Sequence, residues 1–179
     1  MSLKALAAAG LAAALFGGSL AHAQSRTTPR IEHNGDAKSP IASSVFVPAG
    51  YDTLYVSGMT PPVIDQAAPK GTKAAFGDTR TQTIGVLQRL EDELKAHGFS
   101  FADVVQMRVY LVGDPDLGGK MDFAGMMAAY TTKFGTADQP GKPARVTSQV
   151  ASLVGPGQLV EIEVQAARPH AAAKARKKT

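Results

Sequence analysis

Residues 142–147 read Lys-Pro-Ala-Arg-Val-Thr and residues 160–164 read Val-Glu-Ile-Glu-Val, and these two stretches decide the fold. The second alternates carboxylates with branched aliphatic side chains, which is the period-two pattern of a strand with one buried face. In the first, a proline fixes the chain just before a strand that begins near Arg145. Gly155-Pro156-Gly157 lies between the two stretches and predicts a turn. We therefore expect the two strands to be antiparallel neighbours.

The alternation along these strands predicts which side chains share a face. If Val146 and Val160 both meet a core, Arg145 and Glu161 project together from the opposite, polar face of one sheet. That polar face is expected to carry Arg108, Tyr110, Arg145, Thr147, Gln149, Glu161, Glu163 and Gln165, together with Val104.

The rest of the chain predicts two helices and three further strands. Strands are expected at 42–47, 53–56 and 104–111, in addition to the two stretches above. One helix should begin at Asp78 or Thr79 and close at His97-Gly98, because it carries apolar residues at three- and four-residue spacing. A second helix is expected at about 121–134. This order predicts an α+β fold in which two helices pack on one face of a mixed sheet and nothing covers the other.

The 179 residues divide into one domain with flanking segments. Residues 1–23 combine an early lysine, a short apolar run and an Ala-His-Ala site, which predicts a signal peptide cleaved after Ala23. A periplasmic or secreted location, with no membrane attachment after cleavage, follows from that prediction. Residues 24–40 are interpreted as a flexible lead-in, 41–168 as the folded domain and 169–179 as a disordered basic tail.

Charge and composition narrow the possible functions. The net charge is +4, but removing Lys4 and the four basic residues of the tail leaves the body at −1, so no nucleic-acid partner is expected. The chain has no cysteine, which excludes disulfides, thiolate ligands and cysteine nucleophiles. None of the four histidines is spaced from another as metal ligands are, so no metal is expected.

Three motifs together resemble those of the Rid family (reactive intermediate deaminases, also called YjgF). They are Ser57-Gly58-Met59-Thr60-Pro61, Pro143-Ala144-Arg145 and Glu161-Ile162-Glu163. The resemblance covers about residues 40–168, with both predicted helices between the motifs. It implies a chorismate-mutase-like subunit that forms a homotrimer through its open sheet face, with clefts between subunits.

The resemblance also implies an activity, the hydrolysis of a 2-imino acid, such as 2-iminopropanoate, to a 2-oxo acid and ammonia. In deaminating members of the family, the arginine at the position of Arg145 grips the substrate carboxylate, and a guanidinium suits that task because it forms two parallel charge-assisted hydrogen bonds. Glu161 matches the glutamate that holds or polarises the attacking water. Ser57, Gly58 and the backbone amide of Thr147 would line the same cleft. The family reaction needs no cofactor.

The sequence departs from the family pattern at three cleft positions. The best-studied deaminases carry Tyr where this chain has Ile41, Asn where it has Met127, and Cys where it has Thr147. The first two changes remove a hydroxyl and an amide, so Ile41 and Met127 are expected to bear on which substrate is bound.

The residues also allow other interpretations. Arg145 could form an ion pair with Glu161 or Glu163, and Arg108 could pack or pair at a subunit contact. At the level of function, the alternatives are a trimeric module that binds small carboxylates without turnover, and an interaction protein that uses its surface and basic tail.

Overall fold

The computed structural model describes residues 29–170. The predicted signal peptide and nearly all of the predicted tail lie outside the described residues, so those predictions stay predictions. Within residues 29–170, no helix is both long enough and apolar enough to span a bilayer.

Four strands form one mixed sheet. They are β3 (Tyr51–Met59), β4 (Val104–Val112), β5 (Ala144–Val150) and β6 (Val160–Pro169). Their order across the sheet is β3-β6-β4-β5, with β5 parallel to β4 and the other pairs antiparallel. Strand β6 therefore has partners on both sides, and β5 is an edge strand.

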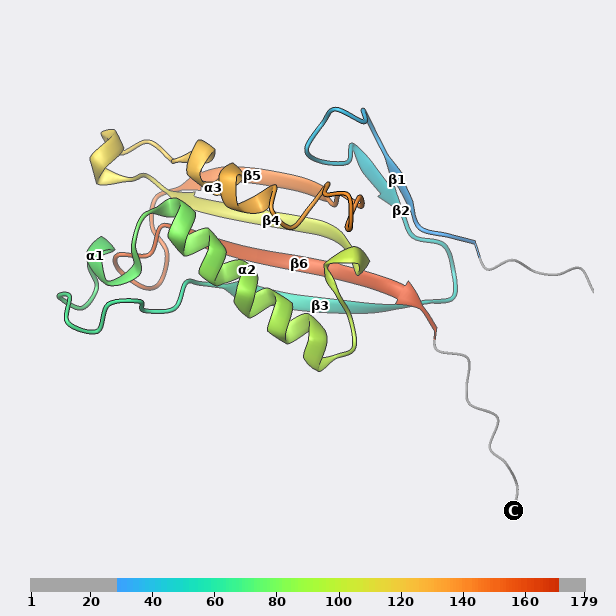
Figure 1. Cartoon of the computed structure of the whole chain (residues 1–179), viewed down its shortest axis with the longest axis horizontal. Coiled ribbons are helices and arrows are strands. Elements are labelled where there is room, and N and C mark those ends of the chain that lie inside the picture. Colours follow the sequence, from blue (N-terminus) through green and yellow to red (C-terminus); the bar gives the residue numbers. More distant parts are fainter. Residues whose placement is uncertain (1–28, 171–179) are drawn as a thin grey trace, which may run out of the picture.

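Two helices cover one face of this sheet, as predicted (Figure 1). Helix α2 (Thr79–Ala96) begins where the sequence indicates, because the Asp78 carboxylate accepts a hydrogen bond from the Thr81 amide. It ends at His97, followed by Gly98 with a positive φ of 73°. Helix α3 (Phe123–Tyr130) is shorter than its predicted span and is capped by Asp122. The expected α+β architecture is confirmed.

Smaller elements lie at the ends of the sheet. Helix α1 (Lys73–Phe76) is a single turn, and short 3-10 turns occupy 101–103 and 115–117. Strands β1 (Glu32–Asn34) and β2 (Ser44–Phe46) form a separate hairpin near the start of β5 (Figure 1). The sequence pattern did not predict β1, which lies in the segment interpreted as a flexible lead-in.

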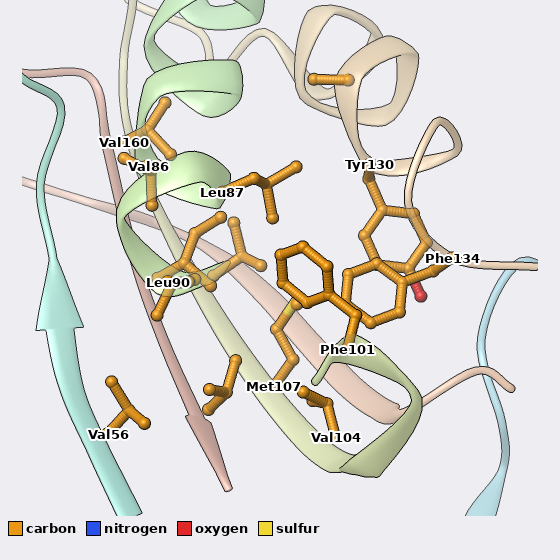
Figure 2. Close-up of a cluster of buried hydrophobic side chains, with 14 of the residues drawn as sticks. Val56, Val86, Leu87, Leu90, Phe101, Val104, Met107, Tyr130, Phe134 and Val160 are labelled. Atoms are coloured by element: carbon orange, nitrogen blue, oxygen red, sulfur yellow. The ribbon is translucent and has the colours of Figure 1, made fainter. Parts of the chain in front are cut away.

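The hydrophobic core fills the space between the sheet and the two helices. Figure 2 shows Met107 of β4 beneath the rings of Phe101, Tyr130 and Phe134. The Tyr130 and Phe134 rings stack with their centroids 4.8 Å apart. Burial of such aromatic and aliphatic surface is the main stabilising contribution to a domain of this size. This packing also holds α3 in position against the sheet, and α3 carries one side of the candidate site.

The predicted pairing of β5 with β6 is wrong. Strand β6 lies between β3 and β4, so β4 separates it from β5. The connection at 151–159 is not a two-residue hairpin turn, and its length lets the chain pass over β4 before re-entering the sheet. The strongly alternating β6 thereby takes a central position, where its aliphatic face is fully buried.

The predicted faces are also wrong for β5. Arg145 is paired with the buried Met107, so its side chain points to the helix-covered face, whereas Val146 is paired with Arg108 on the open face and is 49% exposed. Glu161 is paired with Tyr110 and lies on the open face. Arg145 and Glu161 therefore occupy opposite faces of the sheet. The same register places Thr147 on the helix side, because it is paired with Val109.

Val104 was predicted on the polar face but is buried in the core. A register shift between Val104 and Gln106 inserts one extra residue opposite β6. Such a bulge resets the alternation of side chains, which explains why both Val104 and Val105 are buried.

Candidate functional site

The side chain of Arg145 lies against the aromatic residues of α3. Its guanidinium carbon is 4.3 Å from the centroid of the Tyr130 ring and 5.9 Å from that of Phe123. Pro143, which is buried, fixes the chain just before this residue. Guanidinium groups stack favourably on aromatic faces, so the helix holds the charge in place without neutralising it.

No carboxylate contacts Arg145 among the described residues. Its Nη2 donates to the Met127 sulfur at 3.1 Å, a weak acceptor, and its buried Nη1 has no partner there. Thr147, two residues further along the same face of β5, also has a buried hydroxyl without a partner among them. Burial lowers the pKa of Arg145, an effect that Tyr130 partly offsets, yet an arginine stays charged. This arrangement leaves a cation able to receive an acceptor group.

Tyr130 links Arg145 to the N-terminal part of the domain. Its ring is almost fully buried, and its hydroxyl donates to the carbonyl of Pro40 at 3.1 Å. Burial raises the pKa of Tyr130 to about 12, although the Arg145 charge acts in the opposite direction, so the phenol is neutral at physiological pH. Tyr130 was not among the predicted site residues, although it supports Arg145. The signal was the spacing of Phe123, Met127 and Tyr130, which places all three on one side of a helix.

The segment that contains Ile41 runs beside the start of β5. The Ala42 amide donates to the Pro143 carbonyl at 3.1 Å, and Lys142 Nζ donates to the carbonyls of Ala37 and Ser39. A hollow of about 320 Å³ opens between this segment and the sheet. It is lined by Ile41, Ala42, Ser43, Gln106, Ala144, Arg145 and Val146. Ile41 and Arg145 line this hollow, Met127 contacts the Arg145 guanidinium, and Thr147 follows Arg145 on the same face of β5. These four predicted site residues therefore lie at one edge of the sheet.

A second group of predicted site residues lies on the open face. Glu161 packs directly against Gly58, so closely that a Cβ at position 58 would overlap its carboxylate. Ser57 is exposed next to Gly58 on β3. Among the described residues, the Glu161 carboxylate has no hydrogen-bond or ion-pair partner. This face therefore presents a free carboxylate that the sheet separates from Arg145 of the same chain.

The other charges of the open face pair with each other. Arg108 Nη1 lies 2.6 Å from Glu163 Oε1, and the Tyr110 hydroxyl donates to the same oxygen at 3.4 Å. An ion pair of Arg145 with Glu161 or Glu163 is therefore excluded within one chain. Arg108 does pair, as one interpretation expected, but inside its own subunit.

Metal ligands do not gather anywhere in residues 29–170, since no three His, Asp or Glu side chains are grouped to hold an ion. The described side chains offer a stacked arginine at the β5 edge and a free carboxylate on the open face.

The helix-covered mixed sheet with a motif arginine at its edge defines a Rid/YjgF-type α+β subunit. The model of the family described as Endoribonuclease L-PSP matches residues 37–168, and the chain belongs to this family.

Similar proteins agree with this assignment. The chain is 36% identical over 129 residues to a RutC family protein of Pyrococcus horikoshii, covering 72% of this chain and 89% of that protein. It is 38% identical over 113 residues to a RutC family protein of Sulfurisphaera tokodaii, covering 63% and 78%. Among solved structures, the Rid-family protein YyfB from Yersinia pestis is 25% identical with a TM-score of 0.53, covering 71% and 86%.

Proposed function

We propose that this protein is a cofactor-independent deaminase that hydrolyses 2-imino acids. Water adds to the carbon of the protonated C=N bond, the C–N bond then breaks, and a 2-oxo acid and an ammonium ion leave. Arg145 binds the substrate carboxylate and Glu161 holds and polarises the water. A protonated imine is already electrophilic, so these two groups suffice for the chemistry.

The observation that carries the proposal is the unfilled hydrogen-bonding capacity of Arg145. An arginine that stabilises a fold normally pairs with a carboxylate or a carbonyl, whereas this one has a sulfur contact and a buried Nη1 without a partner among the described residues. A bound carboxylate would supply two charge-assisted hydrogen bonds, each contributing about 1.5–3 kcal/mol. Stacking on Tyr130 holds the fork oriented before the ligand arrives.

The opposite placement of Arg145 and Glu161 has a consequence for assembly. One sheet separates the two side chains, so a site that contains both must combine Arg145 of one chain with Glu161 of another. We propose a homotrimer in which the open face of each subunit meets the β5 edge of its neighbour. The exposed Tyr55 and Val146 on that face provide apolar surface for such a contact.

Mixing two inactive variants tests both the activity and the shared site. Arg145→Ala and Glu161→Gln should each reduce ammonia release from a freshly generated 2-imino acid by about 100-fold or more. Unfolding and refolding them together at equal amounts should restore about a quarter of wild-type activity, since random assembly unites two intact residues in about one site of four. Wild-type protein that leaves the spontaneous rate unchanged with every imino acid would refute the deaminase. Active wild type with no recovery on mixing would refute the shared site.

A module that binds carboxylates without turnover is the second candidate. It is favoured by the apolar Ile41 and Met127 beside Arg145, which offer no hydrogen bond to a reacting nitrogen or to water. Calorimetry that detects 2-oxo acid binding while the ammonia assay stays flat would select it.

The family description also names an endoribonuclease activity. We do not carry that activity to this chain, because acidic side chains outnumber basic ones in residues 29–170, whereas RNA binding relies on basic surface. The three histidines of this region also make separate contacts, each with a different partner. His33 bonds the Lys142 carbonyl, His97 pairs with Glu93 and His170 with Asp52.

A further inference from the structure

We infer that the Arg145 site selects substrates with an aliphatic side chain of four carbons or so, such as the 2-imino acid derived from leucine, and that Met127 and Ile41 are the residues that select them. This inference rests on the proposed function and names its substrate class.

The surroundings of Arg145 are apolar on the sides that a substrate side chain would meet. The Met127 thioether lies 3.1 Å from Nη2, and the Phe123 ring, 43% exposed, lies 5.9 Å from the guanidinium carbon. Ile41 follows Pro40, whose carbonyl accepts from the hydroxyl of Tyr130, the ring that supports Arg145.

Ile41 is held in position by its neighbours. The Ser39 hydroxyl donates to the Ile41 carbonyl at 2.8 Å and lies 3.2 Å from the Ile41 amide, which donates to it. The next residue is bonded through its amide to Pro143, and the preceding Pro40 carbonyl accepts from Tyr130. Ile41 also packs against the core. The apolar wall is thus preorganised relative to Arg145, and ligand binding does not have to order it.

The chemistry of the ligand follows from this geometry. In any 2-imino acid the carboxylate and the side chain are attached to the same carbon, so a carboxylate on Arg145 places the side chain a few ångströms away, against Met127 and Ile41. Burying an aliphatic chain there removes apolar surface from water, which stabilises the complex. A carboxylate or hydroxyl in that position would lose its hydration without gaining a partner. A methyl group would reach little of the wall.

The first test compares substrates on the wild-type protein. An amino-acid oxidase generates the imino acids of leucine, alanine and glutamate in the assay, and ammonia release gives kcat/KM for each. We expect the leucine-derived imine to be preferred about 10-fold or more over the alanine-derived one, and more strongly still over the glutamate-derived one. Equal kcat/KM values for all three would overturn the inference and leave the deaminase intact.

The second test assigns the selectivity to residues. Met127→Asn and Ile41→Asn should each bring the leucine-to-alanine ratio to within about 3-fold of unity, with Arg145 still binding the carboxylate. Met121→Asn and Ile84→Asn are matched controls, because Met121 is likewise partly buried against the core and Ile84 is exposed on α2, and neither contacts Arg145 or lines the hollow. Site variants that keep the wild-type ratio as the controls do would overturn the assignment.

A binding measurement separates the two proposals. If no imine is turned over, calorimetry with 4-methyl-2-oxopentanoate and with pyruvate still reports the ligand class. An affinity about 10-fold higher for the larger acid, lost in Met127→Asn, would support the inference while the proposed deaminase fails. Equal affinities would overturn it.

Discussion

The two faces of the sheet hold arginines in opposite ways. Arg108 and Arg145 lie on neighbouring strands, one residue apart in register, yet one points to the open face and the other to the helices. Arg108 is paired at 2.6 Å with Glu163, which raises its pKa. Arg145 lies on an aromatic ring, and burial lowers its pKa.

This difference separates a structural arginine from a binding one. Where a carboxylate of the same chain already pairs with the guanidinium, as at Arg108, a ligand carboxylate has less charge left to bind. A stacked arginine keeps its in-plane N–H groups available, because the aromatic face engages the π surface and not the donors. The functional contrast between the two faces therefore depends on the Tyr130 ring that supports Arg145.

The largest effect is expected from Arg145→Lys. Lysine keeps the charge but loses the planar fork, so the affinity for a 2-oxo acid should fall by about 100-fold in calorimetry. Arg168→Lys is the matched control, since Arg168 is also stacked, 4.5 Å above Phe99, and donates to the Gly98 carbonyl. It should change affinity by less than about 3-fold. Similar losses of affinity in both variants would show that the effect is not specific to Arg145, and would contradict its role in carboxylate binding.

Much of the fold followed from local sequence signals. The Asp78 cap, the His97-Gly98 end of α2 and the alternation of β4 and β6 are encoded in consecutive residues, and all were predictable. Strand order was not, because the 151–159 connection is too long to dictate a partner for β6. The bulge at Val105 was not predicted either, although the consecutive residues Val104 and Val105 interrupt the alternation at that point.

The candidate site was predictable in its members but not in its arrangement. The motif around Arg145 identified the residue, yet β5 reads Ala-Arg-Val-Thr-Ser-Gln-Val, and its more apolar alternate set lies on the open face, so the alternation indicated the wrong orientation. Its orientation is set by tertiary contact, because the guanidinium finds an aromatic surface on α3. Tyr130 was not predicted as a site residue, and it is both a buried core residue and the support of Arg145.

The open face can be tested at Gly58. A methyl group there would overlap the Glu161 carboxylate and push it aside, so Gly58→Ala should lower the rate of ammonia release by about 10- to 100-fold. Binding of a 2-oxo acid to Arg145 should change by less than about 3-fold, because the displaced carboxylate holds the water and does not bind the ligand carboxylate. In the Glu161→Gln background, the same substitution should cost little more, since the displaced group no longer acts. Additive losses would show that Gly58 matters for another reason.

The smallest effect concerns the ring beneath Arg145. Because burial raises the pKa of Tyr130 from 10.0 to about 12, the folded state holds its proton at a pH where the unfolded chain loses it. The contribution of Tyr130 to the free energy of unfolding is therefore fully present below about pH 10. It declines as the pH rises towards 12 and is lower by about 1.4 kcal/mol at pH 11. Between pH 8 and pH 11, the free energy of unfolding measured in urea should fall by about 1.4 kcal/mol less in Tyr130→Phe than in the wild type. At pH 8 the variant should be less stable by only about 1 kcal/mol, for the lost hydrogen bond to Pro40.

The Tyr130→Phe variant should bind 2-oxo acids as the wild type does, since a phenyl ring still supports the guanidinium. An affinity that falls with the hydroxyl would show that the phenol, and not the aromatic face, prepares Arg145 for its ligand.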